Sequence, residues 1–144
     1  MDSRTIKALE FGKVLEHLAG LCVSEAGRRV SLGLFPLRDA DAVNAAHTLF
    51  DEVRTWSAHS GFRLSDFPDL EGLFPHLEKA AVSPSSAPLD ADALWALRET
   101  LLQGRNAAQS INENGAMWPS LRDLVASMPL PEMTLSALSR CLGD

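Results

Sequence analysis

Tyrosine is absent from this 144-residue chain, and only two cysteines are present, Cys22 and Cys141. They lie far apart and without CxxC spacing, which favours two reduced thiols over a disulfide or a metal site. Uninterrupted apolar stretches are only a few residues long, far short of the roughly 20 residues that cross a bilayer. The amino terminus also lacks the apolar region of a secretory signal. We therefore expect a cytoplasmic protein without membrane contact.

Positive charge is scarce as well. The 13 basic residues are outnumbered by 19 acidic ones, which gives a net charge of -6. This balance opposes broad electrostatic attraction to phosphate backbones, so contact with nucleic acid would need a local basic patch. Hydrophobic residues form 46% of the chain and charged residues 22%, which is close to average globular usage. The length fits a single helical domain, residues 1–144, with its own core.

Apolar residues recur at the three- and four-residue spacing of amphipathic helices through most of the chain. No segment shows the alternation typical of a strand, and residues 83–88, SPSSAP, have the composition of a surface loop. We expect an all-α fold, a helical bundle in which the two long helices, 40–60 and 91–113, pack antiparallel. The full pattern predicts helices over residues 5–22, 25–34, 40–60, 69–81 and 91–113, and two shorter helices that begin at Pro119 and Pro131. The first helix is expected to break near Phe11 and to stop near Gly20. The helix over 69–81 is expected to kink or to restart at Pro75.

Capping residues mark the expected helix ends. Ser24 and Asp90 are suitable N-caps, Asp39 or Asp41 can cap the helix over 40–60, and Gly61 suits the position after its end. The same helix carries an apolar stripe at helical spacing and is long enough to act as a scaffold. The stripe consists of Val43, Ala46, Phe50, Val53 and Ser57, with Leu49 and Trp56 on its flank.

Catalytic patterns are missing from the sequence. The histidines form no HxxxH or HExxH pair, and the acidic pairs sit in first helical turns or on solvated faces, where the helix dipole or water accounts for them. Neither a G-x-S-x-G motif nor a phosphate-binding glycine loop occurs. The three tryptophans are more typical of core or interface anchors than of base-stacking platforms. We assign no catalytic, cofactor-binding or metal-ligating residue to this chain. The histidines are His17, His47, His59 and His76, and the tryptophans are Trp56, Trp95 and Trp118.

One local basic group stands out. Lys13, Arg28 and Arg29 would lie near one another if the first two helices pack antiparallel. Ordinary solvated charges are the simpler interpretation. Contact with phosphate, or pairing with an acidic partner, is the functional alternative.

The opening stretch, LEFGKVLEHLAGLCVSEAGRRVSLGLFPLRDADAV at residues 9–43, resembles the amino terminus of MutS2 proteins. The resemblance is carried by Leu9-Glu10-Phe11, a leucine-rich helix with Leu15 and Leu18, a turn with Ser24 and Gly27, then Pro36 and Asp39. It is specific over the first 60 residues and looser from residue 62 onward. The segment LSALSRCLGD at the end resembles the family sequence just before its Asp-Gly-x-x-x-Asp-x-Ser stretch, so we expect the chain to be part of a longer protein.

The resemblance implies much about such a parent protein. MutS2 proteins begin with the helical core or lever region, followed by a clamp, a dimerising P-loop ATPase that uses ATP and Mg²⁺, and usually an Smr endonuclease domain. They are associated with binding branched DNA, suppressing homologous recombination and rescuing collided ribosomes. None of the ATP-binding or Smr motifs occurs in these residues. The implied role is a non-catalytic lever whose partners are the remaining domains of its own chain and, through them, DNA or the ribosome.

Two other classes of function stay open on the sequence. A free-standing helical adaptor would bind another protein through a helix groove, and it predicts a native protein of 15.6 kDa. A small helical enzyme would need a pocket that unites histidine and carboxylate side chains from separate helices. The lever interpretation predicts instead an exposed apolar strip, since the helices that would cover it lie elsewhere in the parent protein.

Overall fold

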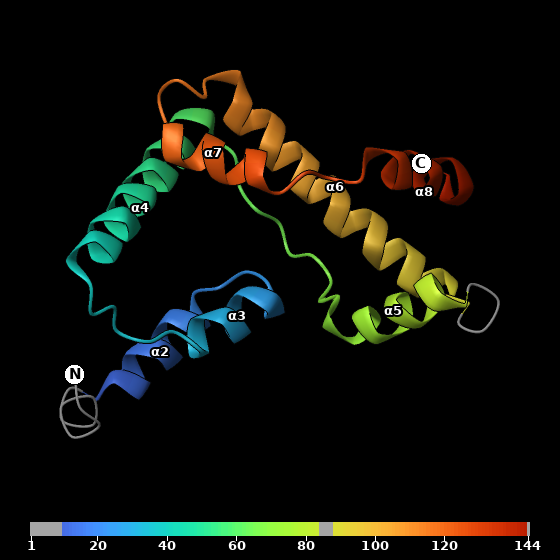
Figure 1. Cartoon of the computed structure of the whole chain (residues 1–144), viewed down its shortest axis with the longest axis horizontal. Coiled ribbons are helices and arrows are strands. Elements are labelled where there is room, and N and C mark those ends of the chain that lie inside the picture. Colours follow the sequence, from blue (N-terminus) through green and yellow to red (C-terminus); the bar gives the residue numbers. More distant parts are fainter. Residues whose placement is uncertain (1–9, 84–87, 144) are drawn as a thin grey trace.

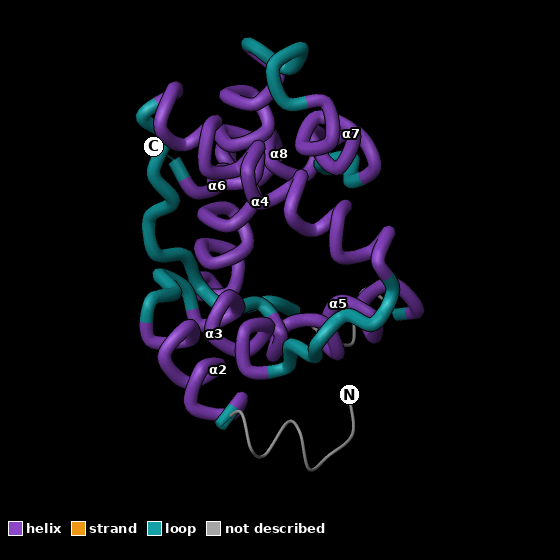
Figure 2. Tube along the Cα trace, turned by 90° about the vertical axis from the view of Figure 1, so that its left-hand side faces the viewer, coloured by secondary structure: helices purple, strands orange, loops and turns teal. Residues whose placement is uncertain are grey.

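The computed structural model of the chain describes residues 10–83 and 88–143. These residues form helices without strands, so the all-α prediction is confirmed (Figures 1 and 2). The predicted first turn over residues 5–9 and residues 84–87 of the predicted loop lie outside the described residues. The elements are α2 (Phe11–Gly20), α3 (Glu25–Leu32), α4 (Ala40–Ser60), the short 3-10 helix η1 (Glu71–Leu73), α5 (Phe74–Val82), α6 (Ala91–Glu113), α7 (Pro119–Ser127) and α8 (Glu132–Leu142).

Side-chain caps start three of these helices where the sequence predicts. The Ser24 hydroxyl accepts from the Gly27 amide at 3.1 Å, and Asp90 Oδ1 accepts from the Ala93 amide at 2.8 Å. Of the two aspartates proposed for α4, Asp39 is the cap, since its Oδ2 accepts from the Ala42 amide at 2.9 Å. Each bond satisfies an amide that has no partner within its own helix.

The helix end and the proline positions also follow the sequence closely. Gly61 ends α4 with a φ of 66°, a left-handed conformation that glycine adopts without steric cost. The segment around Pro75 restarts as a new helix rather than kinking, because η1 ends at Leu73 and α5 begins at Phe74. Pro119 is the first residue of α7, whereas Pro131 immediately precedes α8. The fixed φ of proline suits the first turn of a helix, where its missing N–H is no loss.

The main core lies where α4, α6 and α7 meet. Trp56, Ile111, Trp118 and Leu121 are buried there, with Leu49, Phe62, Ala107 and Val125 packed around them. Two indole N–H groups bond to neighbouring positions near the carboxyl end of α6: Trp56 Nε1 donates to Ser110 Oγ at 3.1 Å, and Trp118 Nε1 donates to the Ile111 carbonyl at 2.8 Å. Apolar burial and paired polar atoms therefore hold the same junction.

The two long helices are arranged differently from the side-by-side antiparallel pair expected from their lengths. In Figure 1, α4 and α6 meet near their carboxyl ends and diverge toward their amino ends. The hydrogen bond that joins them, from Trp56 to Ser110, lies in the last turns of the two helices. The α7 helix lies between them near this junction and packs on both.

The remaining helices attach to this frame at other places. The α8 helix packs on α6 through its buried Leu135 and Leu138. Residues 61–70 cross α6, where the Thr100 hydroxyl donates to the Pro68 carbonyl at 3.3 Å and the Gln103 side chain bonds to Ser65. Within the described residues, no helix is long and apolar enough to cross a membrane.

The α2 and α3 helices form a hairpin away from the main core, side by side in both views (Figures 1 and 2). Its interior is small and partly polar, with Ala19, Ser24 and Ser31 buried. Cys22 Sγ lies 3.1 Å from Ser31 Oγ across the hairpin. The antiparallel packing of the first two helices is therefore present, and little apolar area is buried in it.

Candidate functional site

Large apolar side chains remain exposed over the first third of the described chain. Phe35 is 81% exposed and Leu21 is 70% exposed, values far above those of core residues. A folded monomer rarely leaves so many apolar side chains uncovered in one region. Exposed apolar side chains, which the lever interpretation requires, are therefore present here, while their continuity as one strip stays a prediction. They are Val14, Leu18, Leu21, Val23, Val30, Leu32, Leu34, Phe35, Leu37, Phe50 and Val53.

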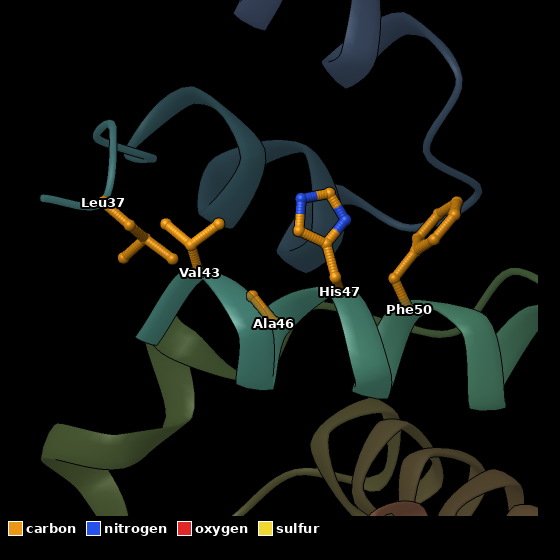
Figure 3. A pocket seen from close by; sticks show the side chains of 5 residues that line it. All are labelled: Leu37, Val43, Ala46, His47 and Phe50. Atoms are coloured by element: carbon orange, nitrogen blue, oxygen red, sulfur yellow. The ribbon is translucent and has the colours of Figure 1, made fainter. Parts of the chain in front are cut away.

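A groove on α4 gives this region a defined shape. Leu37, Val43, Ala46, His47 and Phe50 line a volume of about 480 Å³, which we call the α4 groove. Figure 3 shows the four helical side chains on one side of α4, with Leu37 reaching them from the preceding segment. Apart from the imidazole of His47, the lining is hydrocarbon, so the groove suits apolar side chains rather than a charged ligand.

The position of the α4 groove follows from the two-sided pattern of α4. Leu49 and Trp56 turn toward the core with α6 and α7, which leaves the stripe that begins at Val43 on another side of the helix. Val43, Ala46 and Phe50 are spaced by three and four residues, the spacing that lets a second helix pack alongside. Phe50 is 64% exposed at the end of this row. The α4 groove can therefore accept the apolar side of a helix.

The structure places the three predicted basic residues on the hairpin, each beside a carboxylate of the same chain. Lys13 Nζ lies 2.7 Å from Glu10 Oε1, and Arg28 Nε lies 3.5 Å from Glu25 Oε2. Both pairs are local, at a separation of three residues. These charges are half or more exposed, where an ion pair contributes about 0–1 kcal/mol and a competing anion can replace it.

Arg29 forms the long-range pair of the group. Its Nη1 contacts Asp69 and lies 2.7 Å from Glu71 Oε2, while Nη2 donates to Asp69 Oδ1 at 3.3 Å. The hydrogen bond from Arg29, followed by one from the Glu71 amide, lowers the pKa of the Asp69 carboxyl. The same hydrogen bond raises the pKa of Arg29. Two carboxylates around one guanidinium make this spot less attractive to a phosphate than the sequence suggests.

No group of three histidine, cysteine, aspartate or glutamate side chains is placed to hold a metal ion within residues 10–83 and 88–143. His47 lines the α4 groove, whereas His59 stands edge-on to Trp118 with ring centroids 5.8 Å apart. The α4 groove therefore remains the feature that a functional interpretation must explain.

Comparison with known proteins identifies the chain's relatives. It is 39% identical over 145 residues to a protein named Endonuclease MutS2 from Maridesulfovibrio salexigens, a match that covers all of this chain and 18% of that protein. The chain is similar to MutS2 proteins over its whole length. It is 33% identical over 151 residues to Endonuclease MutS2 of Solidesulfovibrio magneticus. It is 28% identical over 134 residues to Endonuclease MutS2 of Pelotomaculum thermopropionicum. No family model and no solved structure matches the chain.

The share of each relative that is matched bears on function. The chain spans 18% of the first two MutS2 relatives and 16% of the third, while 92–100% of the chain itself is matched. The resemblance of the opening residues to MutS2 proteins is thereby confirmed. The exposed apolar side chains and the α4 groove thus belong to a segment whose relatives are much longer chains.

Proposed function

We propose that this chain is the non-catalytic amino-terminal helical segment of a MutS2 protein, and that it docks against helices of the remaining protein through the α4 groove. The observation that carries the proposal is the row Val43, Ala46 and Phe50, of which Ala46 and Phe50 are exposed and Val43 is half-buried, in a chain that spans 18% of its relatives. Burying such side chains is favourable by roughly 25 cal/mol per Å² of apolar surface. The partner is therefore an amphipathic helix of the same protein.

The proposal extends to the whole protein as an inference from its family. The remainder would bind ATP and Mg²⁺, form a homodimer, bind branched or mismatched DNA and carry an Smr endonuclease domain. Its roles would be suppression of homologous recombination, DNA repair and rescue of stalled ribosomes in the cytoplasm. The 144 residues would serve as a lever, since α4 and α6 are long helices joined rigidly by the Trp56–Trp118 core. Because side chains at such a junction are closely packed, a displacement of one helix is transmitted to the other.

Replacing Phe50 by aspartate tests the docking surface. With this chain and the remainder of its MutS2 protein supplied as two polypeptides, we expect Phe50→Asp to weaken their association at least tenfold, measured by calorimetry. The carboxylate would have to be buried in an apolar contact without a partner. Thr48→Asp is the matched control, because Thr48 is an exposed residue of the same helix outside the α4 groove. Equal affinities of the Phe50→Asp variant and the unchanged chain would refute the proposal and favour a free-standing adaptor.

Contact of Lys13, Arg28 and Arg29 with phosphate remains a prediction, and the salt dependence of DNA binding measures it. Each lost phosphate contact reduces the slope of log affinity against log salt by about 0.9 on duplex DNA. We expect the Lys13→Ala, Arg28→Ala double variant of the full-length protein to show a reduction of up to about two such steps, and Arg29→Ala a smaller one, because Arg29 already serves two carboxylates. An unchanged slope in both would assign these charges to pairs within the chain.

A further inference from the structure

The α2–α3 hairpin is attached to the rest of the described chain by few contacts. In the described residues, α2 and α3 make their main helix contact with each other. Residues 34–39 lead from α3 to α4 without helical structure, and Leu34, Phe35 and Leu37 in this segment are exposed rather than packed. A turn within this segment would therefore cost little buried apolar area at Leu34 and Phe35.

The Arg29 cluster provides the second attachment. Arg29 lies on α3, whereas Asp69 and Glu71 lie at the start of η1, 40 or more residues further along the chain. Asp69 is itself held in place, because its Oδ1 also accepts from the Glu71 amide at 3.1 Å. The neighbouring Pro68 carbonyl bonds to Thr100 on α6. The cluster therefore connects the hairpin to a segment that is itself hydrogen-bonded to α6.

Exposure to solvent weakens the ion pairs of Arg29 with Asp69 and Glu71. The Arg29 side chain is 43% exposed, Asp69 27% and Glu71 62%. Ion pairs with this degree of exposure are weak and are screened over a Debye length of about 8 Å at physiological salt. The fork of the guanidinium adds geometric definition, because it reaches both oxygens of Asp69. Such a contact fixes a position yet releases it readily.

We propose that the α2–α3 hairpin is a hinged arm that turns about residues 33–39, and that Arg29 with Asp69 and Glu71 is the latch that holds it against the α6 frame. Release moves the apolar side chains of the hairpin, such as Val14 and Val30, relative to the α4 groove. The latch thus determines whether the apolar side chains of the hairpin keep their position relative to the α4 groove.

A distance measurement between spin labels tests the latch. Labels at Glu16 on α2 and Arg105 on α6, both exposed, report the position of the hairpin in a chain whose Cys22 and Cys141 are replaced by serine. At low salt we expect one narrow distance distribution. Arg29→Ala should raise the population of other distances roughly fivefold, because the contacts of the guanidinium with both carboxylates are lost. One molar salt should have a similar effect on the unchanged latch, because it screens the same pairs.

Matched variants separate the latch from general damage. Arg28→Ala removes the adjacent arginine, which forms an ion pair with Glu25 on its own helix, and should leave the distribution unchanged. The Asp69→Asn, Glu71→Gln double variant should reproduce Arg29→Ala from the other side of the contact. Helix content is checked by circular dichroism in each case. A distribution that stays the same in both latch variants and in one molar salt would overturn the proposal.

Discussion

Replacing Trp118 by alanine is expected to lower the free energy of unfolding of the chain by about 3–5 kcal/mol, the usual cost of truncating a buried tryptophan. The side chain has no exposed area and lies at the centre of the core that joins α4, α6 and α7. Its indole N–H also donates to the carbonyl of Ile111 in the last turn of α6, where carbonyls lack partners within the helix. Urea unfolding followed by circular dichroism measures the change.

Two comparisons sharpen this prediction. Trp118→Phe retains most of the apolar volume but loses the donor to Ile111, so we expect a loss of about 1–3 kcal/mol. Trp95→Ala is the matched control, because Trp95 is 38% exposed on α6 and should cost less than half as much as Trp118→Ala. Similar losses for the Trp95 and Trp118 alanine variants would show that the junction does not depend on Trp118.

The helix positions could be predicted from sequence because their signals are local. The expected helices over 40–60 and 91–113 coincide with α4 and α6, and that over 25–34 ends two residues beyond α3. A cap residue, a glycine or a proline lies within a few residues of each end and acts directly on the backbone there. Information of this kind does not depend on the rest of the fold.

The relative placement of the long helices could not be predicted in this way. Trp56 and Ser110 are 54 residues apart, and no local sequence pattern predicts their hydrogen bond. Both long helices have more than one apolar side, so periodicity leaves open which side of each faces the other. Trp118, from the segment after α6, enters the junction and fixes the choice, and the expected antiparallel pairing along the helix lengths gives way to contact at the carboxyl ends.

In the candidate site, too, the local features could be predicted from sequence and the long-range contacts could not. The row Val43, Ala46 and Phe50 was readable as an apolar stripe, but its exposure depends on Leu49 and Trp56 occupying the core instead. The basic residues were likewise readable as neighbours. Glu10 and Glu25 stand three residues from their partners, as helix periodicity suggests, whereas Asp69 meets Arg29 across 40 residues. Long-range pairs of single charges leave no signal in one sequence.

The same junction shows how α4 positions α7. No side chain of its own segment caps the amino end of α7, which starts at Pro119 after the N-cap residue Trp118. Glu52 of α4 supplies the missing acceptor, because its Oε2 accepts from the Leu121 amide at 2.8 Å. A carboxylate at a helix amino terminus also interacts favourably with the helix dipole. One side chain thereby orients α7 on α4 across 69 residues of sequence.

Glu52→Ala is therefore expected to lower the free energy of unfolding by about 2 kcal/mol, the typical loss of a hydrogen bond to a charged group at a partly buried amide. Glu52→Gln retains an acceptor without the charge and should lose about half as much. Asp51→Ala is the matched control, because its carboxylate is exposed and pairs with Arg54 at 3.4 Å on the surface of α4. We expect that variant to change the free energy by less than about 0.5 kcal/mol in the same urea titration. A loss no larger for Glu52→Ala than for Asp51→Ala would mean that α7 is held on α4 by the apolar contacts of Trp118 and Leu121 alone.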